Sequence, residues 1–295
     1  CSSDLAELAE LAAIGRQRRR PLIDSPDGRR IALADGGRRT LINWASNDYL
    51  ACATRLVVRN GAFRALRSYG AGSGAARLLG GGLRLHRNVE VRAARFLGRE
   101  DALLTTSGFQ ANLALLTTLA GEPGDALILD RLCHASLYDG ARLSAGQLLR
   151  FRHNDIADLE RQLERCATAR RRIVVVEAVY SMDGDEAPLA AVADACRRHG
   201  ARLVVDEAHA LGVLGPGGRG LCAELGLKPD AVVATCSKAL GAQGGLIVGD
   251  RDLIELVVNR GRAFIYSTAP VPAASGAALA ALRWLDEHPQ APGDL

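Results

Sequence analysis

Short apolar runs rich in β-branched residues alternate with segments of helical periodicity from about residue 100 onward. Strands are predicted at 102–105, 126–129, 173–177, 203–206, 231–235 and 245–248, and helices at 109–119, 136–143, 156–166, 189–199, 253–260 and 271–287. Because these strands are apolar throughout instead of alternating, both faces of their sheet should be covered. The pattern therefore predicts an α/β fold with a mainly parallel sheet flanked by helices. In such sheets, ligands gather beyond the carboxyl ends of the strands.

The composition excludes several classes of protein. A chain of 295 residues that is 48% apolar and 24% charged is typical of a globular protein with a sizeable core. No window approaches the roughly 18 unbroken apolar residues of a membrane span, so we expect no membrane partner. The 37 basic residues are scattered among 33 acidic ones, and a net charge of +4 lacks the dense basic footprint of nucleic-acid binding.

The seven cysteines are odd in number and never occur as C-x-x-C. This spacing argues against a structural metal site and against a disulfide framework, and it favours a reduced, cytoplasmic compartment. The first residues also lack the basic and apolar regions of a signal peptide.

Lysine is rare in this chain, since only two of the 37 basic residues, Lys228 and Lys238, are lysines. Lys238 comes just after the predicted strand 231–235 and is followed by small residues, which allow close approach of a bulky planar ligand. An amine can lose its proton and act as a nucleophile, whereas a guanidinium cannot. Lys238 is therefore the candidate nucleophile, and Lys228 is expected to be an ordinary turn residue.

A carboxylate and an imidazole follow the predicted strand 203–206. Asp206 and His209 lie three residues apart, directly before the glycine-rich loop 212–220. Such a pair suits metal ligation, general-base chemistry or two contacts to one planar cofactor, and the plain structural alternative is an acid satisfied at a helix N-terminus. A Schiff-base lysine, an acid 32 residues upstream and a phosphate cradle would together make a pyridoxal phosphate (PLP) site.

Two glycine-containing stretches are candidates for binding phosphate. At 105–109 a strand turns into a helix whose first N–H groups could face a phosphate. The stretch 70–77 is similar to a dinucleotide fingerprint, but its third glycine falls one place early and no strand precedes it. An NAD-dependent dehydrogenase is therefore disfavoured.

Eight stretches, in order along nearly the whole chain, resemble the α-oxoamine synthases of the fold-type I PLP enzymes. They are SNDYL at 46–50, YGAGSG at 69–74, SGFQAN at 107–112, DRLCHASL at 130–137, HND at 153–155, YSMDGD at 180–185, DEAH at 206–209 and SKALG at 237–241. This ordered set is far more specific than any single motif.

The resemblance implies a role for each matched residue around the cofactor ring. Lys238 would hold PLP covalently and then act as general base and acid at the α-carbon of the amino acid. Asp206 would pair with the pyridine nitrogen. His209 and Ser181 would bond the ring hydroxyl, and His134 would stack on the ring.

The same resemblance implies the phosphate contacts and a homodimer. The main-chain N–H groups of Gly108 and Phe109 and the hydroxyl of Thr235 would bind the phosphate. The active site of this family lies at a dimer interface, and Ser267 and Thr268 resemble the segment that reaches the phosphate of the partner.

The predicted substrates are an amino acid and an acyl thioester, which Arg18, His134 and Asn47 would contact. Within the family, the runs at 131–137, 153–155 and 206–215 favour the member of biotin biosynthesis, which joins L-alanine to a pimeloyl thioester of coenzyme A or acyl carrier protein. Carbon dioxide and the thiol carrier would be released. Relatives that use glycine or serine are the alternatives.

Members of this fold also carry a small C-terminal domain, which supplies an arginine for the carboxylate of the amino acid. We therefore expect an N-terminal arm at 1–60, a large PLP-binding domain at 61–287 and, at 288–295, the start of a truncated C-terminal domain. A catalytically incompetent PLP-binding fragment is the remaining alternative.

Overall fold

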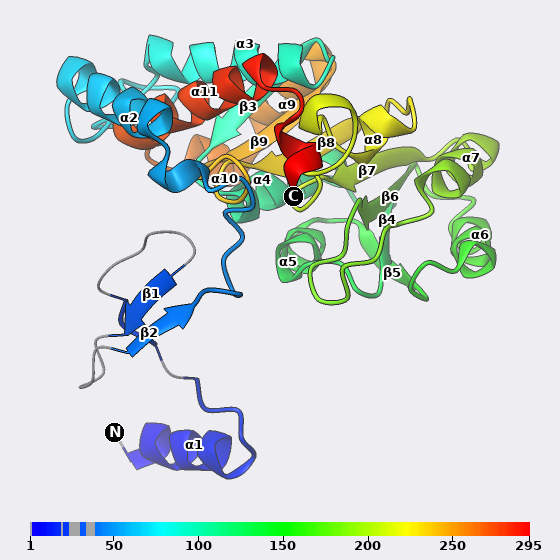
Figure 1. Cartoon of the computed structure of the whole chain (residues 1–295). Coiled ribbons are helices and arrows are strands. Elements are labelled where there is room, and N and C mark those ends of the chain that lie inside the picture. The colour runs from blue at the N-terminus through cyan, green and yellow to red at the C-terminus, as the bar shows by residue number, and fades with distance from the viewer. Residues whose placement is uncertain (1, 19, 24–29, 34–38) are drawn as a thin grey trace. The chain divides into compact units, whose positions relative to one another are not determined.

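The computed structural model describes residues 2–18, 20–23, 30–33 and 39–295, which fall into two compact units divided between Ser46 and Asn47 (Figure 1). The first unit contains helix α1 (Ser2–Ala13) and an antiparallel pair of strands, β1 (Arg30–Leu33) and β2 (Arg39–Ile42). The predicted division into an arm at 1–60, a domain at 61–287 and a terminal segment at 288–295 stays a prediction.

The second unit is built on a seven-stranded sheet of order β3-β9-β8-β7-β6-β4-β5. Its strands are β3 (Asp101–Thr105), β4 (Asp125–Asp130), β5 (Gln147–Phe151), β6 (Arg171–Glu177), β7 (Arg202–Asp206), β8 (Ala231–Thr235) and β9 (Gly245–Gly249). Strand β9 pairs antiparallel with β3 and β8, and the other neighbouring strands pair in parallel. This confirms the predicted α/β fold with a mainly parallel sheet.

Helices cover both faces of this sheet (Figure 1). They are α2 (Leu56–Tyr69), α3 (Arg84–Phe96), α4 (Gly108–Leu119), α5 (Ala135–Leu143), α6 (Ile156–Arg165), α7 (Leu189–His199), α8 (Leu221–Glu224), α9 (Arg251–Arg260), α10 (Arg262–Ile265) and α11 (Pro272–Glu287), with short 3-10 helices at Cys52–Thr54, Pro216–Gly218 and Ala291–Asp294. None of the helices in the described part of the chain has the length and apolar character needed to cross a membrane.

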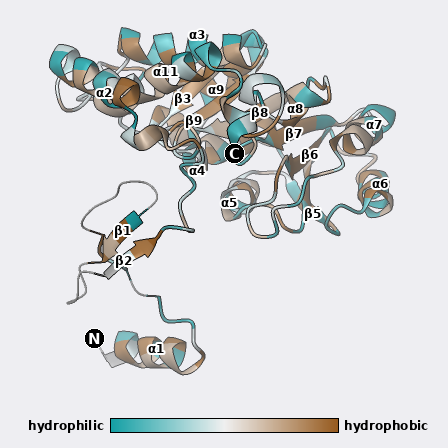
Figure 2. Ribbon diagram, in the orientation of Figure 1, coloured by the Kyte–Doolittle hydropathy of each residue, from teal (hydrophilic) through white to brown (hydrophobic). Residues whose placement is uncertain are grey.

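Successive residues of β3, β8 and β9 belong to two separate apolar cores. Leu103 and Val233 pack in the core that includes α4 and α5, whereas Leu104 and Val232 pack in the core that includes α2, α3 and α11. Figure 2 shows β6 and β7 in the hydrophobic colours. Burial of both faces explains why these strands lack alternation, and it fixes the sheet as the rigid support of the loops at its carboxyl edge.

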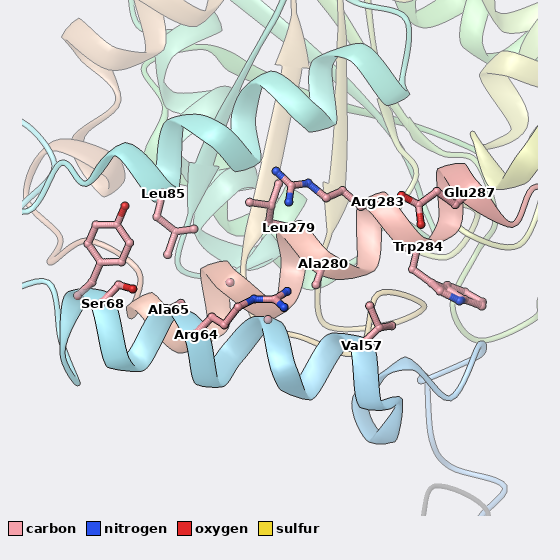
Figure 3. Close-up of a pocket in the computed structure, with 13 residues that line it drawn as sticks. Val57, Arg64, Ala65, Ser68, Leu85, Leu279, Ala280, Arg283, Trp284 and Glu287 are labelled. Atoms are coloured by element: carbon pink, nitrogen blue, oxygen red, sulfur yellow. The ribbon is translucent and has the colours of Figure 1, made fainter.

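Small residues bring α2 and α11 into close contact. A Cβ on Gly61 would come within 2.6 Å of the carbonyl oxygen of Gly276, so only glycine fits at that crossing. Beside the crossing, Arg64, Arg283 and Trp284 line a groove of about 270 Å³ (Figure 3). None of the predicted site residues lines this groove.

Candidate active site

A second cavity, of about 260 Å³, opens at the carboxyl edge of the central sheet. Its walls come from the last residues of β6, β7 and β8 and from the segments that follow β3, β4, β7 and β8. The lining residues are Ser107, Gly108, Phe109, Asn112, His134, Ser136, Glu177, Asp206, Ala208, His209, Thr235, Ser237 and Lys238. Seven of them are residues that the sequence singled out: Gly108, Phe109, His134, Asp206, His209, Thr235 and Lys238.

The strand register explains why residues so far apart in the sequence meet here. Glu177, the last residue of β6, pairs with Asp206, the last residue of β7, and Asp206 pairs with Val233 of β8. Parallel strands end at the same edge of a sheet, so the segments after them converge. Lys238 follows β8 by three residues and reaches the same cavity.

The environment of Lys238 shifts its amine toward the neutral form. Burial lowers the pKa of its ammonium group, while the charges of Asp206 and Glu177 act in the opposite direction. A lowered pKa raises the share of neutral amine, the form that accepts a proton or attacks a carbonyl carbon. Lys228, by contrast, is exposed after α8.

Asp206 is 4% exposed, and each of its carboxylate oxygens accepts a hydrogen bond. The main-chain N–H of Ala208 donates to Oδ1 at 2.9 Å, and Nδ2 of Asn112 donates to Oδ2 at 2.9 Å. Two N–H donors stabilise the ionised form of a buried carboxylate. The group therefore suits pairing with a protonated ring nitrogen.

His209 lies against Tyr49, whose hydroxyl oxygen is 2.8 Å from Nδ1 of the imidazole. Burial, followed by the charge of Lys238, lowers the pKa of His209 to about 4, so the ring is neutral at pH 7. The Tyr49 hydroxyl also lies 3.3 Å from Oδ1 of Asn47, which places this predicted substrate contact next to His209.

The N-terminus of α4 forms one end of the cavity. Ser107 caps the helix by accepting a hydrogen bond from the main-chain N–H of Gln110, and Gly108 and Phe109 contribute the first helical N–H groups. A Cβ on Gly108 would lie 3.3 Å from Cβ of Thr235, so a side chain there would crowd this end. The open N–H groups suit an anion.

Two hydroxyl groups lie beside this helix N-terminus. Thr235 donates its hydroxyl hydrogen to the carbonyl of Gly244 at 3.0 Å, and its Oγ1 lies 2.8 Å from Oγ of Ser237. Ser237 is exposed and lines the cavity, although the sequence analysis gave it no role. With the hydrogen of Thr235 given to Gly244, Ser237 is the donor in the contact between the two hydroxyl groups, and because it is exposed it can turn toward a bound anion instead. The phosphate contact of Thr235 stays a prediction.

Glu177 is a second acidic group in the cavity, and the sequence predicted no role for it. It is 3% exposed, and burial, together with the negative charge of Asp206, raises the pKa of its carboxyl to about 8. Its Oε1 accepts a hydrogen bond from the main-chain N–H of His134. The only signal for it in the sequence was its place at the end of the predicted strand 173–177.

The other predicted site residues lie outside the lining of this cavity. Ser181 is exposed in the turn after β6, and Thr268 is exposed where it forms a β-bridge with Ala76. Ser267 adjoins Thr268, with its hydroxyl directed to the carbonyl of that residue at 3.4 Å. Arg18 is exposed in the first compact unit. The roles of these four residues stay predictions.

The residues that line the cavity fit PLP. They provide one buried amine, one carboxylate held by two N–H donors, and an open helix N-terminus where glycine leaves room that a Cβ would fill. Within the described ranges, no group of three or more His, Cys, Asp or Glu residues is arranged to hold a metal ion.

The fold and this cavity define an enzyme of the aminotransferase type. The family model for aminotransferase class I and II matches residues 39–291, and the chain belongs to that family. The chain is 48% identical to 8-amino-7-oxononanoate synthase of Anaeromyxobacter sp. (strain K) over 286 residues, which cover 96% of this chain and 71% of the relative. It is 45% identical to the enzyme of the same name from Chromobacterium violaceum, over 95% of this chain and 72% of that one. Within the larger family, the chain belongs with the 8-amino-7-oxononanoate synthases.

A solved structure extends the likeness to the cofactor. Serine palmitoyltransferase from S. paucimobilis, solved with bound PLP, superposes with a TM-score of 0.87 at 32% sequence identity, covering 96% of this chain and 71% of that one. The resemblance inferred from the ordered motifs is therefore confirmed at the level of the family and the fold.

Proposed function

We propose that this chain catalyses the PLP-dependent condensation of L-alanine with a pimeloyl thioester, giving 8-amino-7-oxononanoate, carbon dioxide and the free thiol carrier in biotin biosynthesis. The observation that supports the proposal is that Lys238 and Asp206 line the same cavity. The chain that holds them is 48% identical to an 8-amino-7-oxononanoate synthase. PLP supplies an electron sink for the negative charge that develops at the α-carbon of the amino acid.

Different lining residues would bind different parts of PLP. Lys238 would attach it through its amine, and the carboxylate of Asp206 would pair with the ring nitrogen. The N–H groups of Gly108 and Phe109, with the hydroxyl of Ser237, would bind the phosphate. His134 would cover one face of the ring, and Ala208, beside Asp206, is small enough to allow close approach on the cavity wall.

Once freed, the amine of Lys238 would remove the proton from the α-carbon of alanine and later return a proton to the same carbon. Its lowered pKa supports this role, since a general base works best when its pKa is near the working pH. His209 is neutral at pH 7, so its ring can hold a hydrogen bond without adding positive charge beside Lys238.

The substrate panel that tests the proposal compares L-alanine, glycine and L-serine with pimeloyl, acetyl, succinyl and palmitoyl thioesters. We expect the highest kcat/KM for alanine with the pimeloyl thioester, and presenting the acyl group on coenzyme A and on acyl carrier protein identifies the carrier. Preference for serine with the palmitoyl thioester, or for glycine with a short acyl group, would assign the chain to another α-oxoamine synthase. No turnover with any pair, in PLP-loaded protein, would support the incompetent-fragment alternative.

The active enzyme is proposed to be a homodimer in which Ser267 and Thr268 reach the phosphate in the partner's site. Leu79 and Tyr266, which flank the bridge between Ala76 and Thr268, are 83% and 72% exposed, and apolar groups so exposed favour an interface. Mixing Lys238→Ala chains with Thr268→Ala chains tests this, because a mixed dimer would regain one complete site. No recovered activity in such a mixture would argue against the shared site.

A cytoplasmic location is part of the same proposal. Six cysteines, from Cys52 to Cys236, carry free thiols in the buried interior, which suits a reducing compartment.

A further inference from the structure

Asn112 holds two groups of the candidate active site with one side-chain amide. It lies on α4, is 2% exposed, and its Nδ2 donates to Oδ2 of Asp206 and to Oγ of Ser136, each at 2.9 Å. Ser136 is 1% exposed, and its Oγ lies 2.8 Å from Nδ1 of His134. Three hydrogen bonds therefore connect the carboxylate of Asp206 to the ring of His134 through two buried side chains.

The direction of each hydrogen bond is fixed by the groups at the two ends. The main-chain N–H of Ser136 can only donate, and it lies 3.2 Å from Nδ1 of His134, so Nδ1 accepts and carries no proton. The hydroxyl of Ser136 then donates its hydrogen to the same Nδ1, while its oxygen accepts from Asn112. At the other end, the ionised carboxylate of Asp206 accepts only.

The side-chain amide of Asn112 is oriented by its two partners, because Oδ2 of Asp206 and Oγ of Ser136 both accept a hydrogen from it. Both of its N–H hydrogens are used, whereas its buried Oδ1 makes no hydrogen bond to any residue that the structure describes. Reversing the amide would place a carbonyl oxygen against the carboxylate of Asp206, which is unfavourable for two acceptors in a buried site.

We propose that Asn112 and Ser136 are positioning residues, which hold Asp206 and direct the proton of the neutral His134 ring to Nε2. His134 then presents an N–H donor on the ring edge opposite Ser136. Asn112 and Ser136 touch neither substrate nor cofactor in this account and act only through Asp206 and His134.

The consequence for catalysis rests on the proposed function. A donor at Nε2 of His134 suits the carboxylate of the amino acid substrate, because a neutral imidazole offers one donor and one acceptor and the acceptor is already used by Ser136. Loss of the Ser136 hydroxyl would therefore weaken the use of the amino acid more than that of the thioester.

Nitrogen-15 NMR of the full chain, with and without PLP, tests the proton position without any substrate. The signals of His134 are assigned by their loss in His134→Gln. We expect Nδ1 of His134 to have the shift of an unprotonated nitrogen and Nε2 that of a protonated one. In Ser136→Ala, loss of one hydrogen bond to Nδ1 should raise the ratio of the Nδ1–H to the Nε2–H form roughly fivefold. A smaller rise is expected in Asn112→Leu, because the hydroxyl of Ser136 is then no longer held.

Ser275→Ala is the matched control, since Ser275 on α11 is also 1% exposed and its hydroxyl donates to the main-chain carbonyl of Val271, just before that helix. An unchanged ratio in Ser136→Ala, or an equal rise in Ser275→Ala, would overturn the proposal. Should Ser136→Ala not fold, Ser136→Cys keeps a weaker donor and should give a smaller rise.

Steady-state kinetics separates this inference from the proposed function. We expect kcat/KM for alanine to fall about tenfold in Ser136→Ala, with less than a twofold change in KM for the thioester. A wild-type chain with the expected proton position but no turnover would contradict the proposed function and leave the positioning role supported. Normal kinetics for alanine in Ser136→Ala would contradict the consequence for catalysis.

Discussion

Glu177 and Asp206 occupy paired positions at the ends of β6 and β7, so two carboxyl groups line one cavity from adjacent strands. Two N–H donors hold Asp206, whereas burial and the charge of Asp206 raise the pKa of Glu177 to about 8. The raised pKa keeps the carboxyl of Glu177 largely protonated at neutral pH.

The raised pKa of Glu177 predicts a specific dependence of stability on pH. Between its usual pKa of 4.5 and about 8, the folded state keeps a proton that the unfolded state has lost, so this group makes the free energy of unfolding fall as pH rises through that window. Glu177→Gln keeps the oxygen that accepts from the main-chain N–H of His134 but cannot ionise. In urea unfolding, the variant should gain stability relative to wild type as pH rises from 5 to 8.5; a difference that stays constant would contradict the assignment.

His209 predicts a slope of the opposite sign at lower pH. Its folded-state pKa of about 4 lies below the usual 6.5, so the unfolded state takes up a proton first as pH falls. This group therefore stabilises the fold less as pH falls from 6.5 towards 4. His209→Gln should show a shallower loss of stability in that window, and proton NMR should find one histidine that stays neutral to about pH 4. Titration of His209 near 6.5 would contradict the prediction.

Gly108→Ala should weaken PLP binding with little effect on the fold. The added Cβ would lie 3.3 Å from Cβ of Thr235, in the space that the phosphate would need at the N-terminus of α4. We expect the Kd for PLP to rise about tenfold or more, measured by absorbance titration, since alanine suits a helix better than glycine and should not destabilise α4. Gly293→Ala, where a Cβ would have no neighbour within 4 Å, is the control and should bind PLP as wild type does. Equal affinity in both variants would place the phosphate elsewhere.

Much of the sheet could be predicted because each internal strand is one short, wholly apolar run. The predicted strands at 231–235 and 203–206 differ from β8 and β7 by at most one residue. Strand β5 was not predicted because its sequence is not a wholly apolar run. It lies at the edge of the sheet, where Gln147 and Arg150 are exposed. Helix α3 was missed for a related reason, because Glu90 and His86 occupy core positions; buried Glu90 is paired with Arg77 at 2.8 Å.

From the residues alone, the main candidates for chemistry were predictable because they lie at or just after the end of a strand. Lys238, Asp206 and His209 meet that condition, and the ordered motifs supplied the cofactor that connects them. Asn112 and Ser136 lie inside helices, and whether a helix position faces a cavity depends on how the helix packs on the sheet. The hydrogen bonds that join them to Asp206 and His134 therefore required the three-dimensional structure.

The central claim is that the cavity at Lys238 holds PLP for the condensation. Borohydride treatment of PLP-loaded protein, followed by mass spectrometry of its peptides, tests it most directly, because reduction fixes a pyridoxyl group on the amine that carries it. The account predicts one pyridoxyl group per chain, on Lys238, which L-alanine added before the reduction releases. A pyridoxyl group on Lys228, or no covalent group at all, would contradict the account.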